Sequence, residues 1–123
     1  MILVDSSVWI DHFRKPSTRL AALLDAEEIC THQFVVGEVA CGNLKNRREI
    51  IALLHALPRV QKGDDDDILF FIERHGLNGR GVGLIDVHLL ASCLIDRCYI
   101  WTADKRLQAV AEEMEIESSQ QPH

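Results

Sequence analysis

Short apolar runs typical of buried strands alternate with amphipathic helical segments along most of this chain. Strand-like runs are expected at residues 2–5, 28–31 and 98–102. Helices are expected at residues 6–13, 18–24, 33–43, 46–56, 64–76, 84–96 and 104–114. Because such alternation places helices against a parallel sheet, the chain is predicted to be an α/β protein with a mostly parallel central sheet.

The length of the chain limits it to one compact unit. Its 123 residues, 47% of them hydrophobic, are enough for a single core and too few for two. No internal repeat and no long linker interrupts the pattern. A single domain is therefore expected over residues 1–117, followed by a flexible tail at 118–123 that carries no packing signal.

Charge and composition restrict the environment and the partners of the protein. The formal net charge is -6, which is the wrong sign for coating nucleic acid, so any RNA contact must be local or assisted by cations. With no basic leader and no apolar run near the ~18 residues of a membrane span, a soluble, cytoplasmic protein is expected. The cysteines lack a C-x-x-C spacing and are interpreted as inert, reduced thiols: Cys30, Cys41, Cys93 and Cys98.

Four acids interrupt or directly follow apolar segments, where a charge is normally excluded: Asp5, Glu38, Asp86 and Asp104. Asp5 and Asp104 fall at or just past the predicted ends of strands, the edge at which open parallel sheets bind ligands. Glu38 and Asp86 share helical faces with apolar residues. These spacings predict that the four carboxylates converge.

Carboxylates brought within ~4 Å would repel by roughly 4 kcal/mol per pair at an effective dielectric constant near 20, so a shared cation is expected. Mg²⁺, with Mn²⁺ as a substitute, prefers such oxygen ligands and is often bound together with substrate phosphate. Each acid also has a structural interpretation. Asp104 can cap the last helix, Asp86 can favour a helix start, and Glu38 can pair with an arginine, whereas Asp5 has few such uses beyond capping the next helix.

Four segments of the sequence resemble the acid motifs of the PIN-domain ribonucleases, and within them the small VapC-type toxins. The segments are ILVDSSVWID at 2–11, VGEVACG at 36–42, IDVHLLA at 85–91 and TADKRL at 102–107. The resemblance covers nearly the whole chain and departs only at His88, Cys93 and Leu107, none of which is an acid. It implies a PIN-like three-layer α/β/α sandwich.

The resemblance also implies a Mg²⁺-dependent endoribonuclease that acts as the toxin of a toxin–antitoxin pair. Asp5 and Asp86 would be the main metal ligands, Glu38 and Asp104 would complete the pocket directly or through water, and Ser6 would support them. The implied partners are the RNA substrate, a small antitoxin covering a groove, and a second copy of the chain, with no membrane. Whether one or two metals bind, and which RNA is cut, is left open.

Basic side chains near these motifs are candidates for contacts with RNA phosphates, although each is also typical of solvated surface. They are Lys45, Arg47, Arg48, Lys105 and Arg106, with Arg14, Lys15 and Arg80 as further candidates. The acidic run at 64–67 is interpreted as a helix start, since it lacks the spacing of a calcium loop. The glycines at 79–83 are interpreted as a hinge or close-approach loop.

Three alternatives to a toxin remain at this point. A PIN-type processing nuclease would carry the same acids without a neighbouring antitoxin gene, and a corepressor would keep the fold without catalysis. A receiver-type phosphoacceptor domain is also α/β with clustered aspartates. It requires an early acid pair and an aspartate at a mid-chain strand end, and this chain has neither.

Overall fold

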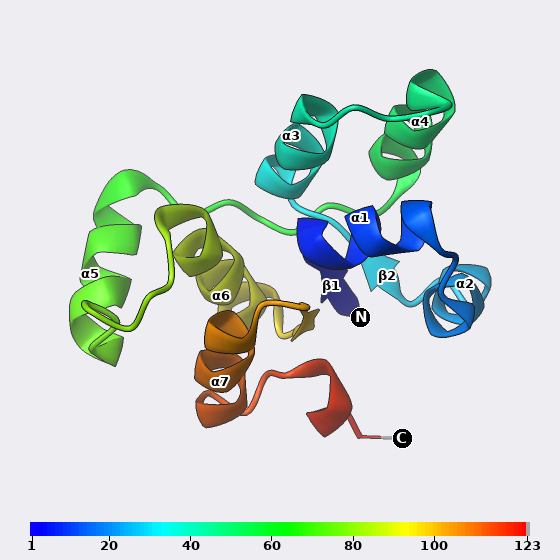
Figure 1. The fold of residues 1–123 in the computed structure, drawn as a ribbon. Coiled ribbons are helices and arrows are strands. Elements are labelled where there is room, and N and C mark those ends of the chain that lie inside the picture. Colours follow the sequence, from blue (N-terminus) through cyan, green and yellow to red (C-terminus); the bar gives the residue numbers. More distant parts are fainter. Residues whose placement is uncertain (123) are drawn as a thin grey trace.

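A three-stranded parallel sheet forms the centre of the molecule in the computed structural model, which describes residues 1–122 (Figure 1). Its strands are β1 (Ile2–Val4), β2 (Ile29–Cys30) and β3 (Tyr99–Trp101). The strand order is β2-β1-β3, and both pairings are parallel, with Leu3 opposite Cys30 on one side and Ile100 on the other. The prediction of an α/β fold with a mostly parallel sheet is confirmed.

Seven α-helices are found within residues 1–122, on both sides of the sheet (Figure 1). They are α1 (Ser6–Arg14), α2 (Thr18–Asp25), α3 (Gln33–Cys41), α4 (Arg47–Ala56), α5 (Asp65–His75), α6 (Leu84–Asp96) and α7 (Lys105–Glu113). Each matches a helix expected from the sequence to within a few residues. Helix α5 lies at the outer edge of the molecule, against α6.

Side-chain caps explain where several helices begin. The Ser17 hydroxyl accepts a hydrogen bond from the Leu20 amide at 3.1 Å at the start of α2, and the Asp64 carboxylate accepts one from the Asp67 amide at 2.8 Å at the start of α5. Such bonds satisfy amides that have no partner in the helix. Helix α5 ends at Gly76, whose φ of +60° favours glycine.

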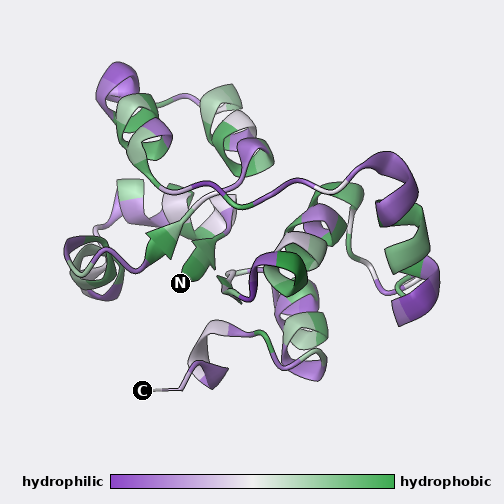
Figure 2. Ribbon diagram, turned by 180° about the vertical axis from the view of Figure 1, so that it is seen from behind, coloured by the Kyte–Doolittle hydropathy of each residue, from purple (hydrophilic) through white to green (hydrophobic). Residues whose placement is uncertain are grey.

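The middle strand is the most deeply buried element. All three residues of β1 are buried, with Leu3 and Val4 at 0% exposure, because β2 and β3 cover its edges and helices cover its faces. Figure 2 shows the strands as hydrophobic, while hydrophilic residues are concentrated toward the helix ends and loops. Since β1 ends at Val4, the next residue, Asp5, emerges directly from the core.

Two isolated parallel bridges extend the edges of the sheet. Thr31 pairs with Arg59 beside β2, and Ile100 pairs with Glu117 beside β3. In the second bridge, the Ile100 amide donates to the Ile116 carbonyl at 2.7 Å. The segment after α7 therefore returns to the sheet.

The expectation of a tail without packing from residue 118 is wrong for its first residues. Ser118–Gln120 forms a short 3₁₀ helix, and Ser118 is only 4% exposed. The Ser118 hydroxyl accepts a hydrogen bond from Arg19 Nη2 at 3.2 Å, and the Glu117 carboxylate accepts one from the Ser119 amide at 2.8 Å. His123, the last residue of the expected tail, lies outside the described residues.

In the described part of the chain, no helix has both the length and the apolar composition needed to cross a bilayer.

Candidate active site

Asp5 anchors the candidate site at the carboxyl end of β1. Its side chain is 5% exposed, and its amide donates to the Trp101 carbonyl at 2.9 Å, so backbone pairing with β3 fixes its position. Oδ1 accepts from the Ser6 amide at 2.8 Å. Oδ2 accepts from the Ser7 hydroxyl at 2.8 Å and from the Thr102 hydroxyl at 2.7 Å. These donors replace the water that a buried carboxylate loses.

Ser7 and Thr102 are site residues that sequence reasoning missed. Each hydroxyl donates a hydrogen bond to Asp5 and also accepts one from a backbone amide. Ser7 accepts from the Ala103 amide at 3.0 Å, and Thr102 accepts from the Asp104 amide at 3.0 Å. Together they join the ends of β1 and β3. Hydroxyl residues that follow Asp5 and the third strand are the sequence signal that could have found them, because both strand ends lie at the same edge of a parallel sheet.

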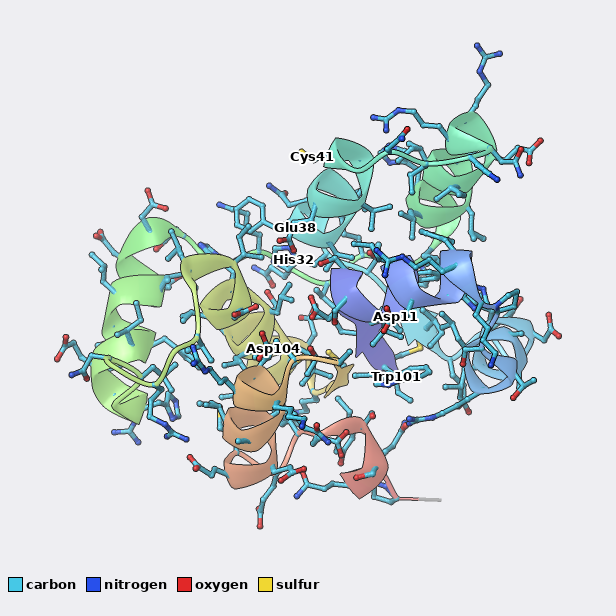
Figure 3. All side chains as sticks on the ribbon, viewed as in Figure 1. Asp11, His32, Glu38, Cys41, Trp101 and Asp104 are labelled. Carbon is cyan, nitrogen blue, oxygen red and sulfur yellow. The ribbon has the colours of Figure 1, made fainter. Side chains whose placement is uncertain are left out.

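Glu38, on α3, reaches the same region through Ser6. The Ser6 hydroxyl donates to Glu38 Oε1 at 3.1 Å and lies 3.5 Å from Asp5 Oδ1, so it joins the two acids. The expectation that Glu38 lies in an apolar setting is wrong, because its side chain is exposed. Figure 3 shows Glu38 and Asp104 on the same side of the molecule.

Asp86 and Asp104 have capping roles at the starts of two helices. Asp86 Oδ2 accepts from the Gly83 amide at 3.0 Å in the first turn of α6. Asp104 Oδ1 accepts from the amides of Arg106 at 2.9 Å and Leu107 at 3.1 Å at the start of α7. Asp86 is half-buried and Asp104 is exposed, so the expectation of an apolar setting is wrong for Asp104 as well.

Three helix amino termini carry three of the four acids. Asp5 is the N-cap of α1, Asp104 is the N-cap of α7, and Asp86 lies in the first turn of α6. The positive end of a helix dipole stabilises a nearby carboxylate by about 0.3–1 kcal/mol. This arrangement partly offsets the repulsion among the acids and explains how the fold holds them near one another.

The remaining repulsion is visible in the pKa values of two acids. Partial desolvation, followed by the charges of Asp5 and Asp86, raises the pKa of Glu38. Desolvation, followed by the charges of Asp5 and Asp104, raises the pKa of Asp86. The four acids are thus one electrostatic group with Asp5 at its centre, although each comes from a different segment of the chain.

A bound cation would offset the repulsion among these acids. The donor atoms present are all oxygens, which suit Mg²⁺ or Mn²⁺. Within residues 1–122, no three acid, histidine or cysteine side chains surround one point closely enough to enclose an ion. Mg²⁺ is usually held by one or two carboxylates and keeps several waters, so it does not require such an enclosure.

The candidate RNA contacts divide into two groups. Lys105 and Arg106 directly follow Asp104 in the first turn of α7, and the Arg106 side chain lies over Gly81. Lys45, Arg47 and Arg48 are exposed residues past the carboxyl end of α3, where Arg47 donates to the Gly42 carbonyl at 3.2 Å. Of the further candidates, Arg80 forms an ion pair with Glu113 at 2.8 Å. Only the α7 pair adjoins an acid of the site in sequence.

Comparisons with known proteins place this geometry in context. The family model of the PIN domain matches residues 2–113. The chain is 41% identical over 114 residues to proteins named Ribonuclease VapC32 from two Mycobacterium tuberculosis strains, CDC 1551 / Oshkosh and ATCC 25618 / H37Rv, covering 92% of this chain and 92% of each relative. The crystal structure of PAE2754 from Pyrobaculum aerophilum superposes on this chain with a TM-score of 0.66, over 89% of this chain and 83% of PAE2754. At 13% sequence identity, this similarity shows a shared fold.

Proposed function

Because this chain belongs to the PIN-domain family and is a VapC-type ribonuclease by its relatives, we propose that it is a divalent-metal-dependent endoribonuclease acting as the toxin of a toxin–antitoxin pair. The observation that carries the proposal is the cluster around Asp5. A buried, hydrogen-bonded carboxylate lies among three further acids, and two of these have raised pKa values. A receiver-type domain has no support in these matches.

Asp5 and Asp86 would be the main ligands of Mg²⁺, with Mn²⁺ as a substitute, and Glu38 and Asp104 would bind directly or through water. Asp5 Oδ2 already accepts from two hydroxyls, so Oδ1 is the oxygen with a free lone pair for the ion. Asp86 Oδ2 accepts one hydrogen bond, from the Gly83 amide, so like Asp5 Oδ1 it keeps a lone pair for the ion. When bound, the ion would lower the pKa of a water and stabilise charge on the phosphate.

The residues of the chain would then prepare the site for that ion. Ser7 and Thr102 hold the Asp5 carboxylate in one orientation, and Ser6 ties Glu38 to it. Glu38, with its raised pKa, is suited to accept or donate a proton near the scissile phosphate. Lys105 and Arg106 would contact the neighbouring RNA phosphates from the start of α7, where their charges are exposed.

A groove away from the acids supports the antitoxin part of the proposal. A cavity of about 990 Å³ lies between the end of α1, the end of α3 and the start of α4. Ile10, Phe13 and Leu44 line it, with Arg14 and Lys45 among its basic residues. Such a groove fits an apolar segment carrying acidic residues, which is the complement expected of a small inhibitory protein.

Helix α5 supports the proposal of a homodimer. Leu69 and Phe70 are 62% and 70% exposed in its middle, while acids occupy its first turn and Arg74 and His75 its last. Figure 2 shows this pattern as a hydrophobic middle between hydrophilic ends. Two copies of α5 packed antiparallel about a two-fold axis would bury the apolar pair and match acid to base at both ends.

The central test compares Asp5→Asn with Asp11→Asn. Asp11 is an exposed acid on α1 outside the cluster, so its variant is matched in charge and chemistry (Figure 3). We expect Mg²⁺-dependent cleavage of an RNA pool by the parent and by Asp11→Asn, and a loss of about a hundredfold or more in Asp5→Asn. Equal cleavage by all three proteins, unaffected by chelation, would refute the proposed mechanism.

The partners are tested separately from catalysis. Light scattering should report a dimer for the parent and a monomer for Phe70→Asp, whereas Leu53→Asp, at a leucine that is 41% exposed on α4, should remain dimeric. Co-expression with the product of a small adjacent gene should suppress toxicity. A toxic chain that no neighbouring gene product neutralises would instead be a processing nuclease.

A further inference from the structure

Three of the four cysteines form a buried cluster that the proposed nuclease chemistry does not use. Cys30 lies in β2, Cys93 in the last turns of α6, and Cys98 just before β3. Their exposed fractions are 3%, 0% and 3%, and all are free thiols. Cys98 precedes β3, whereas Thr102 and the Asp5 cluster follow the sheet, so the cysteines lie away from the acids. Cys41, the fourth cysteine, is exposed on α3.

The end of α6 brings Cys93 and Cys98 together. The helix ends at Arg97, which has a left-handed φ of +54°, and the Cys98 amide donates to the Cys93 carbonyl at 3.0 Å. In this type of helix end, the side chains at the first and last positions of the closed loop usually make an apolar contact. Here both positions are thiols, so the motif places two sulfur atoms side by side.

Cys98 is the centre of the cluster. Hydrogen bonds from the Cys30 thiol and then from the Cys93 thiol lower the pKa of Cys98, and the same contacts raise the pKa of Cys30 and Cys93. Proton loss is therefore concentrated on one sulfur. The thiolate, and not the thiol, is the nucleophile in cysteine chemistry.

A small cavity gives access to this sulfur. It has a volume of about 230 Å³ and is lined by Cys93 and Cys98 together with Arg97, Tyr99 and Glu115. A water molecule occupies about 30 Å³ of liquid volume, so the cavity has room for several molecules of that size. The charged residues Arg97 and Glu115 are part of its lining, which is compatible with a small polar reagent.

We propose that Cys93 and Cys98 form a redox-active pair that hydrogen peroxide converts to a disulfide. The Cys98 thiolate attacks one peroxide oxygen, an S–O bond forms, the O–O bond breaks, and the departing hydroxide takes a proton to become water. The Cys93 sulfur then attacks the Cys98 sulfenic acid, an S–S bond forms and a second water leaves. In sum, two thiols are oxidised and one peroxide is reduced to two waters.

Cys93, and not Cys30, is the partner in the disulfide because of the sheet order. Cys30 and Cys98 belong to segments on opposite sides of β1, and two strand spacings put their backbones roughly 9–10 Å apart. A disulfide requires Cα atoms within about 7 Å. Cys30 therefore remains a thiol whose hydrogen bond assists Cys98 without forming a bridge to it.

The test is a peptide map of the full-length protein treated with hydrogen peroxide, in a Cys41→Ser background that leaves only the clustered thiols. Trypsin cleaves after Arg80, Arg97 and Lys105, so Cys93 and Cys98 fall in separate peptides, 81–97 and 98–105. We expect these peptides to be recovered as one reducible cross-linked species, and the count of alkylatable thiols in denaturant to fall from three to one.

Two variants identify the roles of the other cysteines. Cys93→Ser should lose the cross-link and accumulate a sulfenic acid at Cys98 that a dimedone probe labels, while Cys30→Ser should keep the cross-link but form it several times more slowly. Three alkylatable thiols after peroxide treatment of the Cys41→Ser protein, or a cross-link between peptides 20–45 and 98–105, would overturn the proposal. Because the parent map requires no change within the cluster, misfolding of a variant leaves the test intact.

Discussion

At the scale of single residues, the Asp5 carboxylate shows how a charge is kept at a nearly buried position. Its oxygens accept from a backbone amide and from two hydroxyls, so solvation by water is replaced by fixed donors. The hydroxyl of Thr102 donates to Asp5 and also accepts the Asp104 amide at 3.0 Å. One side chain thus connects two of the acids.

Replacing Thr102 by valine preserves its shape and removes this connection. We expect a loss of about 1.5–3 kcal/mol in the free energy of unfolding, since a hydrogen bond to a charged, buried acceptor is lost. Mg²⁺ affinity should fall about 10- to 100-fold because Asp5 is no longer held in one orientation. Urea denaturation and Mg²⁺ titration measure the two effects.

Thr102→Ser is the matched control, because it keeps the hydroxyl and should restore metal affinity to near the parent value. If Thr102→Val and Thr102→Ser bound Mg²⁺ equally well, a purely structural role for this residue would be indicated.

At the scale of helices and strands, the sequence predicted the elements well because their signals are local. Ser17 and Asp64 cap helices through residues three positions away, and Gly76 ends α5 by its own conformation. Their hydrogen bonds depend on neighbouring positions alone, so spacing was enough to find them.

The exposure of the acids was less predictable, because it depends on how elements pack. In the sequence, Glu38 shares a helical face with apolar residues. Its side chain is nevertheless exposed, because other elements do not cover this part of α3. The Thr102 contact to Asp5 required the pairing of β1 with β3, which no local pattern specifies. The bridge from Glu117 to Ile100 is non-local in the same way, so the end of the chain was taken for a free tail.

The start of α3 predicts a sensitivity to acid. His32 is the N-cap of this helix, accepts the Phe34 amide at Nδ1 and is 0% exposed. Burial, followed by the charges of His88, Lys62 and Arg59, lowers the pKa of His32 to about 4 from 6.5. Between pH 6.5 and about 4, His32 therefore binds a proton in the unfolded chain and not in the folded chain. The contribution of His32 to stability is fully present above pH 6.5 and is lost as the pH falls toward 4.

The expected loss from His32 is about 3 kcal/mol over that range. His32→Asn keeps a capping acceptor and removes the titration, so its unfolding free energy should depend less on pH. Urea denaturation of both proteins at several pH values between 7 and 4 measures this. Parallel pH profiles for the two proteins would show that His32 does not contribute.

At the scale of the whole molecule, the acid cluster makes stability depend on the metal. Raised pKa values for Glu38 and Asp86 mean that protonation of these groups favours the fold, and that this contribution is lost as the pH rises through their folded-state pKa values. At neutral pH, therefore, their charges destabilise the molecule. A bound cation would remove that cost.

Mg²⁺ should accordingly raise the melting temperature at neutral pH, by an amount that grows with concentration and corresponds to about 2.7 kcal/mol at a hundred times the dissociation constant. Differential scanning fluorimetry with Mg²⁺ or a chelator provides the measurement. In the chelated state Asp86→Asn should melt above the parent, since it removes a charge and retains an acceptor for the Gly83 amide. A parent melting temperature that does not change with Mg²⁺ would contradict the metal site.

The position of β1 in the sheet has a consequence for synthesis of the chain. Residues 2–4 leave the ribosome before residues 29–30 and 99–101, which are their neighbours in the sheet. The strand that positions Asp5 stays unpaired on one side until β3 has emerged, and Thr102 follows later still. Contacts between such distant residues slow folding and delay the cooperative step. A nascent chain of this nuclease is therefore expected to stay harmless until β3 and Thr102 have emerged.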